Sequence, residues 1–82
     1  MVNAIFEEKF KKLFFRIKDS ATKEKIIKQV EKIKENPEIG KPMRYGRKGT
    51  RELYIKPYRL SYIYLPEKKL VYILDLYHKK FQ

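Results

Sequence analysis

The sequence predicts an α+β fold in which an N-terminal helical hairpin packs on one face of a small twisted antiparallel sheet. Two observations lead to this prediction. Apolar residues recur at helical spacing up to residue 35, and the spacing changes to a period of two after residue 49. All seven tyrosines lie beyond residue 44, and aromatic residues favour strands. With 82 residues, the chain is expected to form a single domain, residues 1–82.

The N-terminal part predicts a first helix. The apolar residues that recur there at helical spacing, with lysines between them, are Phe6, Phe10, Leu13, Phe14 and Ile17. The segment from Val2 to Phe6 fits either a short strand or the frayed start of this helix. Asp19 and Ser20 break the pattern, and either residue can cap the helix that follows.

A second helix is predicted from Ala21 to Glu35. Lysines and glutamates cover one side of it, and its apolar side consists of Ile26, Ile27, Val30 and Ile33. Asn36-Pro37 ends the helix, because the residue before a proline disfavours the helical conformation. Only a short turn separates the two helices, so we expect an antiparallel hairpin.

Three strands are predicted after an irregular segment from Glu38 to Gly49. Polar and apolar residues alternate from Arg51 to Lys56 and again from Arg59 to Tyr64. Pro66-Glu67-Lys68 is a turn signal. The third strand, Leu70 to Tyr77, is apolar on both faces and is therefore expected at the centre of the sheet.

The composition restricts the classes of function. The net charge of +11 indicates a polyanionic partner, which can be a nucleic acid, an anionic membrane or an acidic protein. The chain has no cysteine and one histidine, so we expect no disulfide, no metal site and no cofactor. Its uncharged runs are far shorter than the about 18 residues that a membrane span needs. Acidic residues near the N-terminus do not fit a signal peptide, so a cytoplasmic protein is expected.

The remaining candidates for function are basic and aromatic residues of the predicted sheet. The glycines match no phosphate-binding loop, and no nucleophile motif is present. Arginines bind phosphate bidentately and tyrosines stack on unpaired bases, so such a surface can hold single-stranded RNA. Metal-free RNA cleavage also needs a proton acceptor for the 2′-hydroxyl, positive charge at the phosphate and a donor for the leaving 5′-oxygen.

The same residues also have structural interpretations. An arginine on a small sheet is more often solvated or ion-paired than catalytic. Tyr62, Tyr64 and Tyr72 fit a half-buried strand face, so we interpret them as core. His78 fits a polar strand end, and the phenylalanines of the first helix fit the core.

Three segments together resemble one protein family. VEKIKENPEIGKPMR resembles its junction between the second helix and the sheet, and GTRELYIKPYRLSYIY resembles a strand pair whose second strand carries a Tyr-Arg motif. LVYILDLYHKKF resembles its last strand and His-Arg tail. In order and spacing the chain is similar to the RelE/ParE superfamily of toxins, especially to archaeal RelE-type members, over nearly its whole length.

The resemblance implies a fold with two N-terminal helices on a twisted antiparallel sheet. It implies the toxin of a type II toxin–antitoxin system, an endoribonuclease that cleaves mRNA in the A site of the 30S ribosomal subunit without a metal. It also implies a hetero-oligomer with a cognate RelB-like antitoxin that neutralises the toxin.

The resemblance also assigns roles to residues. Arg59 matches the arginine of the Tyr-Arg motif and would stabilise charge on the scissile phosphate. Arg51 matches an earlier basic position, and Lys79 takes the place of the arginine in the tail, where it would stabilise the transition state or protonate the leaving oxygen. The residues expected to contact RNA are Lys80, Tyr54, Tyr58, His78 and Phe81.

Two departures from the family pattern bear on activity. Tyr54 stands where many relatives have a second basic residue. The tyrosine expected a few residues beyond the His-Arg pair is absent from this sequence, and Phe81 can stack on a base but cannot transfer a proton. Tyr54 or Tyr58 would have to replace it.

Other functions stay open beside the nuclease. A ParE-like toxin would inhibit DNA gyrase by binding; Arg51, Arg59 and Lys79 disfavour it, and the absent tyrosine favours it. A catalytically weakened RNA- or ribosome-binding module would need little more than the net charge of +11. A membrane-surface role is the weakest alternative, because the apolar face of the first helix is needed for the core.

Overall fold

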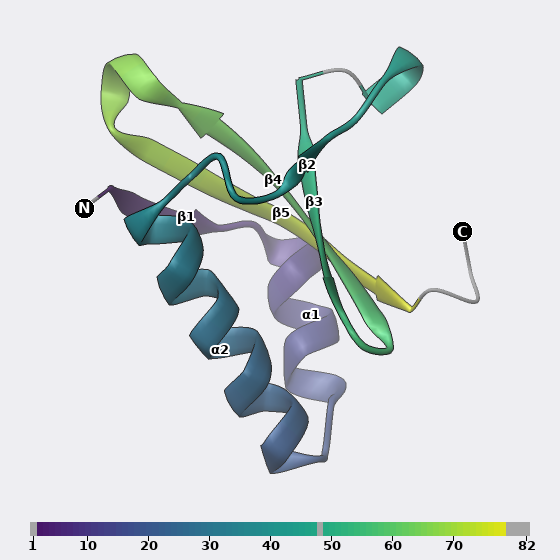
Figure 1. Cartoon of the computed structure of the whole chain (residues 1–82). Helices are drawn as coiled ribbons and strands as arrows, with labels where there is room; N and C mark the ends of the chain where they lie inside the picture. Colours follow the sequence, from purple (N-terminus) through teal and green to yellow (C-terminus); the bar gives the residue numbers. More distant parts are fainter. Residues whose placement is uncertain (1, 48, 79–82) are drawn as a thin grey trace.

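Two α-helices lie on the same side of a five-stranded sheet in the computed structural model, which describes residues 2–47 and 49–78 (Figure 1). The strands lie in the order β1-β5-β4-β3-β2. This arrangement confirms the predicted α+β fold with a helical hairpin on one face of the sheet. Within the described residues, the opposite face of the sheet carries no helix.

The N-terminal segment forms a strand, β1 (Asn3–Phe6), rather than the frayed start of a helix. It runs parallel to the last strand, β5 (Leu70–His78), with Asn3 opposite Leu70. The sheet is therefore mixed, although β2, β3, β4 and β5 pair with one another in antiparallel fashion. Phe6 lies before the first helix, but its ring still packs at 5.4 Å from that of Phe10.

The helices α1 (Glu8–Arg16) and α2 (Ser20–Glu35) follow the predicted segments closely. Asp19 caps α2: its carboxylate accepts a hydrogen bond from the backbone N–H of Ala21 at 3.2 Å and from the hydroxyl of Thr22 at 2.6 Å. These hydrogen bonds, the one from Thr22 foremost, lower the pKa of the Asp19 carboxyl below its ordinary value of 3.8.

The strands β3 (Arg51–Ile55), β4 (Tyr58–Leu65) and β5 are the three predicted strands. The predicted turn is a short 3₁₀ helix, Pro66–Lys68, between β4 and β5. β5 lies between β1 and β4, which confirms its predicted central position. Its residues Val71, Ile73 and Leu76 are fully buried, whereas the remaining side chains of the strand are partly buried.

A short strand, β2 (Lys41–Pro42), pairs with β3 and was not predicted. Two residues are too few to show the alternation by which a strand is detected in a sequence. A 3₁₀ helix, Tyr45–Arg47, lies between β2 and β3. The segment that the sequence marked as irregular therefore adds an edge strand to the sheet.

The core lies between the helices and the sheet. It includes side chains that are almost entirely buried, namely Ile26, Val30, Ile33, Leu60, Tyr62, Val71, Ile73 and Leu76. The prediction that Tyr62 belongs to the core is confirmed, and the partly buried Tyr64 packs against the core, as predicted. Tyr72 is partly buried as well. The volume between the helices and the sheet is thus filled mainly by aliphatic residues, together with the aromatic rings of Phe10 and Tyr62.

The register of the strands decides which side chains share a face. Successive side chains of a strand point to opposite faces. Tyr62 lies in the core beneath the helices, so Arg59, three residues before it in β4, points to the other side. Arg59 pairs with Tyr54 of β3 and with Tyr77 of β5, and Glu52 lies two residues before Tyr54. We call the side that carries Glu52, Tyr54, Arg59 and Tyr77 the open face.

Candidate functional site

Arg59 lies between Tyr54 and Tyr77 on the open face. Its guanidinium carbon is 5.7 Å from the centre of the Tyr54 ring, which is a cation–π contact. The Arg59 side chain keeps 31% of its surface exposed. Because a guanidinium can bind a phosphate through two parallel hydrogen bonds, this position can receive a phosphate from the solvent side.

Glu52 is the buried charged side chain of the described residues, with 5% of its surface exposed. The hydroxyl of Tyr77 donates a short hydrogen bond to its Oε2. Its Oε1 lies 3.7 Å from Nη1 of Arg59. The carboxylate therefore joins the phenol of β5 and the guanidinium of β4 into one cluster on the open face.

The cluster compensates the burial of a negative charge. A carboxylate taken out of water costs several kcal/mol unless a cation and hydrogen-bond donors replace its hydration. Arg59 supplies the cation and Tyr77 supplies a donor. The 3.7 Å between Glu52 and Arg59 is longer than a hydrogen bond, and Nε of Arg59 is buried without a hydrogen-bond partner in the described part of the chain. The guanidinium is thus held only partly by Glu52.

No pattern in the sequence marked Glu52 or Tyr77 as a residue of the site. Alternation placed Glu52 on the polar side of its strand, and Tyr77 ends the apolar run of the last strand. The two residues are 25 positions apart, and a third strand lies between their strands. No local pattern marks such a pair, because it depends on the register of three strands.

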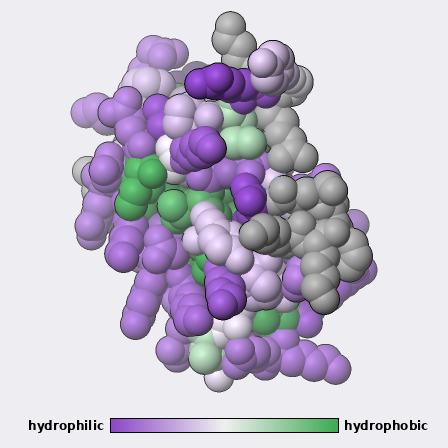
Figure 2. Space-filling view, turned by 45° about the vertical axis from the view of Figure 1, so that its right-hand side comes forward, coloured by the Kyte–Doolittle hydropathy of each residue, from purple (hydrophilic) through white to green (hydrophobic). Residues whose placement is uncertain are grey.

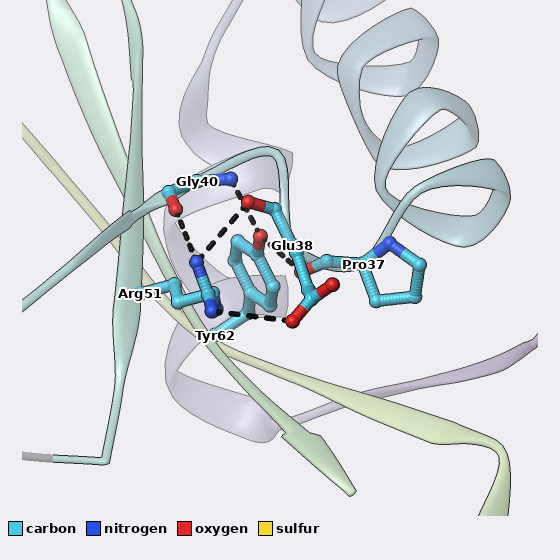
Figure 3. Close-up of polar contacts among 5 residues, drawn as sticks. All are labelled: Pro37, Glu38, Gly40, Arg51 and Tyr62. Atoms are coloured by element: carbon cyan, nitrogen blue, oxygen red, sulfur yellow. Dashed lines mark hydrogen bonds and ion pairs between the residues drawn. The ribbon is translucent and has the colours of Figure 1, made fainter. Parts of the chain in front are cut away.

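Arg51 lies on the opposite side of the sheet from Arg59, because it pairs with the buried Tyr62. Its Nη1 donates to the backbone oxygens of Glu38 at 3.1 Å and Gly40 at 2.8 Å (Figure 3). Its Nη2 lies 3.9 Å from the Glu38 carboxylate. The Arg51 guanidinium thus holds the loop that leads from α2 to the sheet, and the structure does not bring it together with Arg59.

Tyr62 fastens the same loop from within the core. Its hydroxyl donates to the backbone oxygen of Pro37 at 2.7 Å and accepts from the backbone N–H of Gly40 at 2.9 Å (Figure 3). Burial raises the pKa of the Tyr62 phenol above 10.0. A Cβ atom at Gly40 would lie 2.7 Å from this hydroxyl oxygen, so the close approach requires glycine.

Tyr58 and His78 also lie on the helix side of the sheet, since they are register partners next to the pair of Arg59 and Tyr77. Their rings meet edge to face with centres 5.5 Å apart. Tyr58 packs against the core, and neither side chain shares the open face with Arg59. Of the predicted RNA-contacting residues, Tyr54 is the one that the described structure places beside Arg59.

Lys79, Lys80 and Phe81 lie outside the described residues. Their predicted roles therefore remain predictions. They follow directly after β5, the strand that carries Tyr77 and His78.

An apolar groove lies between α1 and α2 on the other side of the molecule from the open face. It has a volume of about 280 Å³ and is lined mainly by Phe6, Phe10, Phe14, Phe15, Ile26, Ile27 and Val30. Ile27 was predicted on the buried side of the second helix, but 51% of its surface is exposed, and Phe15 is 72% exposed. Both residues therefore lie at the surface of the groove.

Hydrophilic side chains surround small hydrophobic patches on the side of the molecule shown in Figure 2. Among residues 2–47 and 49–78, no three histidine or acidic side chains lie close enough to hold a metal ion. Within the same residues, no helix has the length and apolar character needed to cross a membrane.

Comparison with known proteins identifies a family for this arrangement. The family model described as the ParE toxin of the type II toxin–antitoxin system, parDE, matches residues 4–82. Among curated protein sequences no match is found.

Several solved structures share the fold. The toxin–antitoxin complex RelBE2 from Mycobacterium tuberculosis contains a chain that is 21% identical with a TM-score of 0.85, over 95% of this chain and 98% of that one. A chain of the intact E. coli RelBE toxin–antitoxin complex is 22% identical with a TM-score of 0.79, over 93% and 94%. A conserved hypothetical protein from Helicobacter pylori is 23% identical with a TM-score of 0.68, over 98% and 97%. At these identities the likeness concerns the fold.

Proposed function

The chain belongs to the ParE toxin family of type II toxin–antitoxin systems, within the RelE/ParE superfamily, and on this premise we propose that it cleaves mRNA on the ribosome. The reaction would need no metal, and the protein would act in the cytoplasm as a growth-arresting toxin. The observation that carries the proposal is Arg59, whose guanidinium reaches the open face above Tyr54. A net charge of +11 supports binding to RNA.

In this proposal Arg59 binds the scissile phosphate and stabilises the negative charge that develops on it. Tyr54 holds the guanidinium from one side and offers a ring on which a base can stack. Lys79, Lys80 and Phe81 keep their predicted roles in phosphate binding and stacking. For Arg51 the contacts to Glu38 and Gly40 favour support of the loop over contact with RNA.

The test is Arg59→Lys, because lysine keeps a positive charge beside the buried Glu52 but loses the planar fork that binds phosphate. We expect induced expression of the parent chain to arrest growth and to cut mRNA within translated codons. Arg59→Lys should remove most of the cutting, whereas Arg16→Lys, an exposed arginine at the end of α1, should retain it. Cleavage that continues when translation is blocked, or that Arg59→Lys leaves unchanged, would contradict the proposal.

We also propose that an antitoxin of the RelB type neutralises the chain and forms a hetero-oligomer with it. The RelBE structures that share the fold are toxin–antitoxin complexes. The groove between α1 and α2 offers exposed aromatic and aliphatic side chains on a strongly basic protein. An amphipathic helix with an apolar face and acidic flanks fits such a groove.

A second candidate function is the inhibition of DNA gyrase by binding. Two observations favour it: the family model is described as a ParE toxin, and Glu52 places a negative charge beside Arg59. A supercoiling assay with purified gyrase distinguishes the candidates. Inhibited supercoiling together with intact mRNA would replace the nuclease proposal with this one.

A further inference from the structure

We infer that Tyr77 and Glu52 form the proton-accepting pair of the site, with Tyr77 in contact with RNA and Glu52 behind it. The inference rests on the proposed nuclease function. It answers a chemical need of that function, since the cleavage requires an acceptor for the 2′-hydroxyl proton.

The geometry of the open face favours Tyr77 over the other tyrosines. Tyr77 is the register partner of Arg59, so its side chain lies beside the group proposed to bind the phosphate. Tyr58, one of the two tyrosines that sequence analysis considered for proton transfer, lies on the helix side of the sheet. Tyr54, the other, shares the open face, but its ring is stacked against the Arg59 guanidinium.

The hydrogen bond between Tyr77 and Glu52 provides an acceptor for the proton of the phenol. The Tyr77 hydroxyl donates to Oε2 of Glu52, so its oxygen has lone pairs directed away from the carboxylate. Glu52 is too deeply buried to reach a nucleic acid itself. A proton from RNA can therefore reach the carboxylate through Tyr77. Arg59, 3.7 Å from the other oxygen of Glu52, keeps the carboxylate oriented.

The 2′-oxygen forms a bond to phosphorus while the bond from phosphorus to the 5′-oxygen breaks. The 2′-hydroxyl proton moves to the Tyr77 oxygen, and the proton of Tyr77 moves to Oε2 of Glu52. The leaving 5′-oxygen takes a proton from solvent water, and the resulting hydroxide takes a proton from the pair, which returns to neutral Tyr77 and ionised Glu52. The products are a 2′,3′-cyclic phosphate and a 5′-hydroxyl.

The experiment measures single-turnover cleavage of a defined mRNA on translating ribosomes with purified full-length protein. The variants are Tyr77→Phe, Glu52→Gln, both together, and Tyr72→Phe as the matched control. Tyr72 lies on the same strand and the same face as Tyr77 but pairs with Ile63, four residues along β4 from Arg59. Circular dichroism at each assay temperature measures the fraction of folded protein.

We expect Tyr77→Phe and Glu52→Gln each to lower the rate constant by about 100-fold or more, the range for loss of a general base. The rate constant of the double variant should be only slightly lower than that of the slower single variant, because the two groups act as one unit. Tyr72→Phe should retain the parental rate, and all cleaved ends should carry cyclic phosphate.

Two results would overturn the inference while leaving the proposed function intact. One is a rate constant for cleavage by Tyr77→Phe that equals the rate constant of the parent chain. The other is a loss of rate that follows the loss of folded protein, which would assign the pair to stability alone. A parent chain that cuts no mRNA on ribosomes would remove the proposed function itself, and this inference with it.

Discussion

Arg51 and Arg59 lie on adjacent strands but on opposite faces of the sheet. Arg51 pairs with the buried Tyr62 and donates hydrogen bonds to the loop after α2. Arg59 faces solvent beside Tyr54 and contacts the buried Glu52. Two arginines that look alike in the sequence therefore have different neighbours, and their substitution should have different consequences.

Arg51→Ala should destabilise the fold. The change removes two hydrogen bonds from a charged donor to the backbone oxygens of Glu38 and Gly40. We expect a loss of about 2 kcal/mol in the free energy of unfolding, since such bonds to charged groups contribute about 1.5–3 kcal/mol each and this side chain is partly exposed. Urea unfolding measures it. Arg16 lies at an exposed helix end, so the free energy of unfolding of Arg16→Ala should differ from that of the parent chain by no more than about 0.5 kcal/mol. Equal losses of stability in the two variants would refute the role of Arg51.

Arg59→Ala should lower stability as well as activity, because it removes a cation that lies 3.7 Å from the buried Glu52 carboxylate. We expect the free energy of unfolding to fall by about 1–3 kcal/mol, the range for a buried polar group that loses a partner. Adding Glu52→Gln removes the buried negative charge and should restore most of the stability without restoring cleavage. Thermal unfolding of the single and double variants checks this coupling. Additive losses of stability would show that the two side chains do not interact.

Asp19 should make the stability of the protein depend on pH at the start of α2. Its pKa is lowered in the folded state by hydrogen bonds from Thr22 and Ala21. A group with a lowered folded-state pKa stabilises the fold above its unfolded-state pKa, and this contribution is lost as the pH falls through the folded-state pKa. Asp19→Ala should therefore lower the urea midpoint at pH 7, and the difference from the parent should shrink below pH 3.8. A difference that stays constant with pH would exclude the carboxylate as its source.

Phe15→Ala and Ile27→Ala should weaken binding of the cognate antitoxin without weakening the fold. Both side chains are largely exposed in the groove between α1 and α2, so they contribute little to the core. We expect a loss in affinity of about tenfold for each change, as for well-packed interface residues. Calorimetric titration of each variant with the antitoxin measures this. Ile39→Ala is the matched control, because Ile39 is an exposed apolar residue outside the groove, and an equal loss there would argue against groove binding.

Much of the fold could be predicted because its elements have strong local patterns. Helical spacing marked α2, the alternation marked β3 and β4, and the continuous apolar run placed β5 at the centre. The two residues of β2 were too few to show a pattern. The parallel pairing of β1 with β5 is a contact between distant parts of the chain, which no local signal reports.

Less of the site could be predicted. The family resemblance indicated Arg59, and Arg59 reaches solvent on the open face. For Arg51, the alternation within its own strand already grouped it with the apolar residues Leu53 and Ile55. This grouping was a signal that Arg51 lies on the helix side of the sheet. The burial of Glu52 and its contact with Tyr77 arise only when three strands are in register, so they follow from the structure alone.

The pairing of β1 with β5 also sets an order of events during synthesis. Asn3 lies opposite Leu70, so the first strand to leave the ribosome has no partner until β5 has been made. The two helices are made early and likewise lack the sheet on which they pack. Strand pairing between such distant positions is intrinsically slow, because a long loop has to be closed first. Tyr77 arrives on the same late strand, so the nascent toxin cannot assemble the open face until β5 is complete.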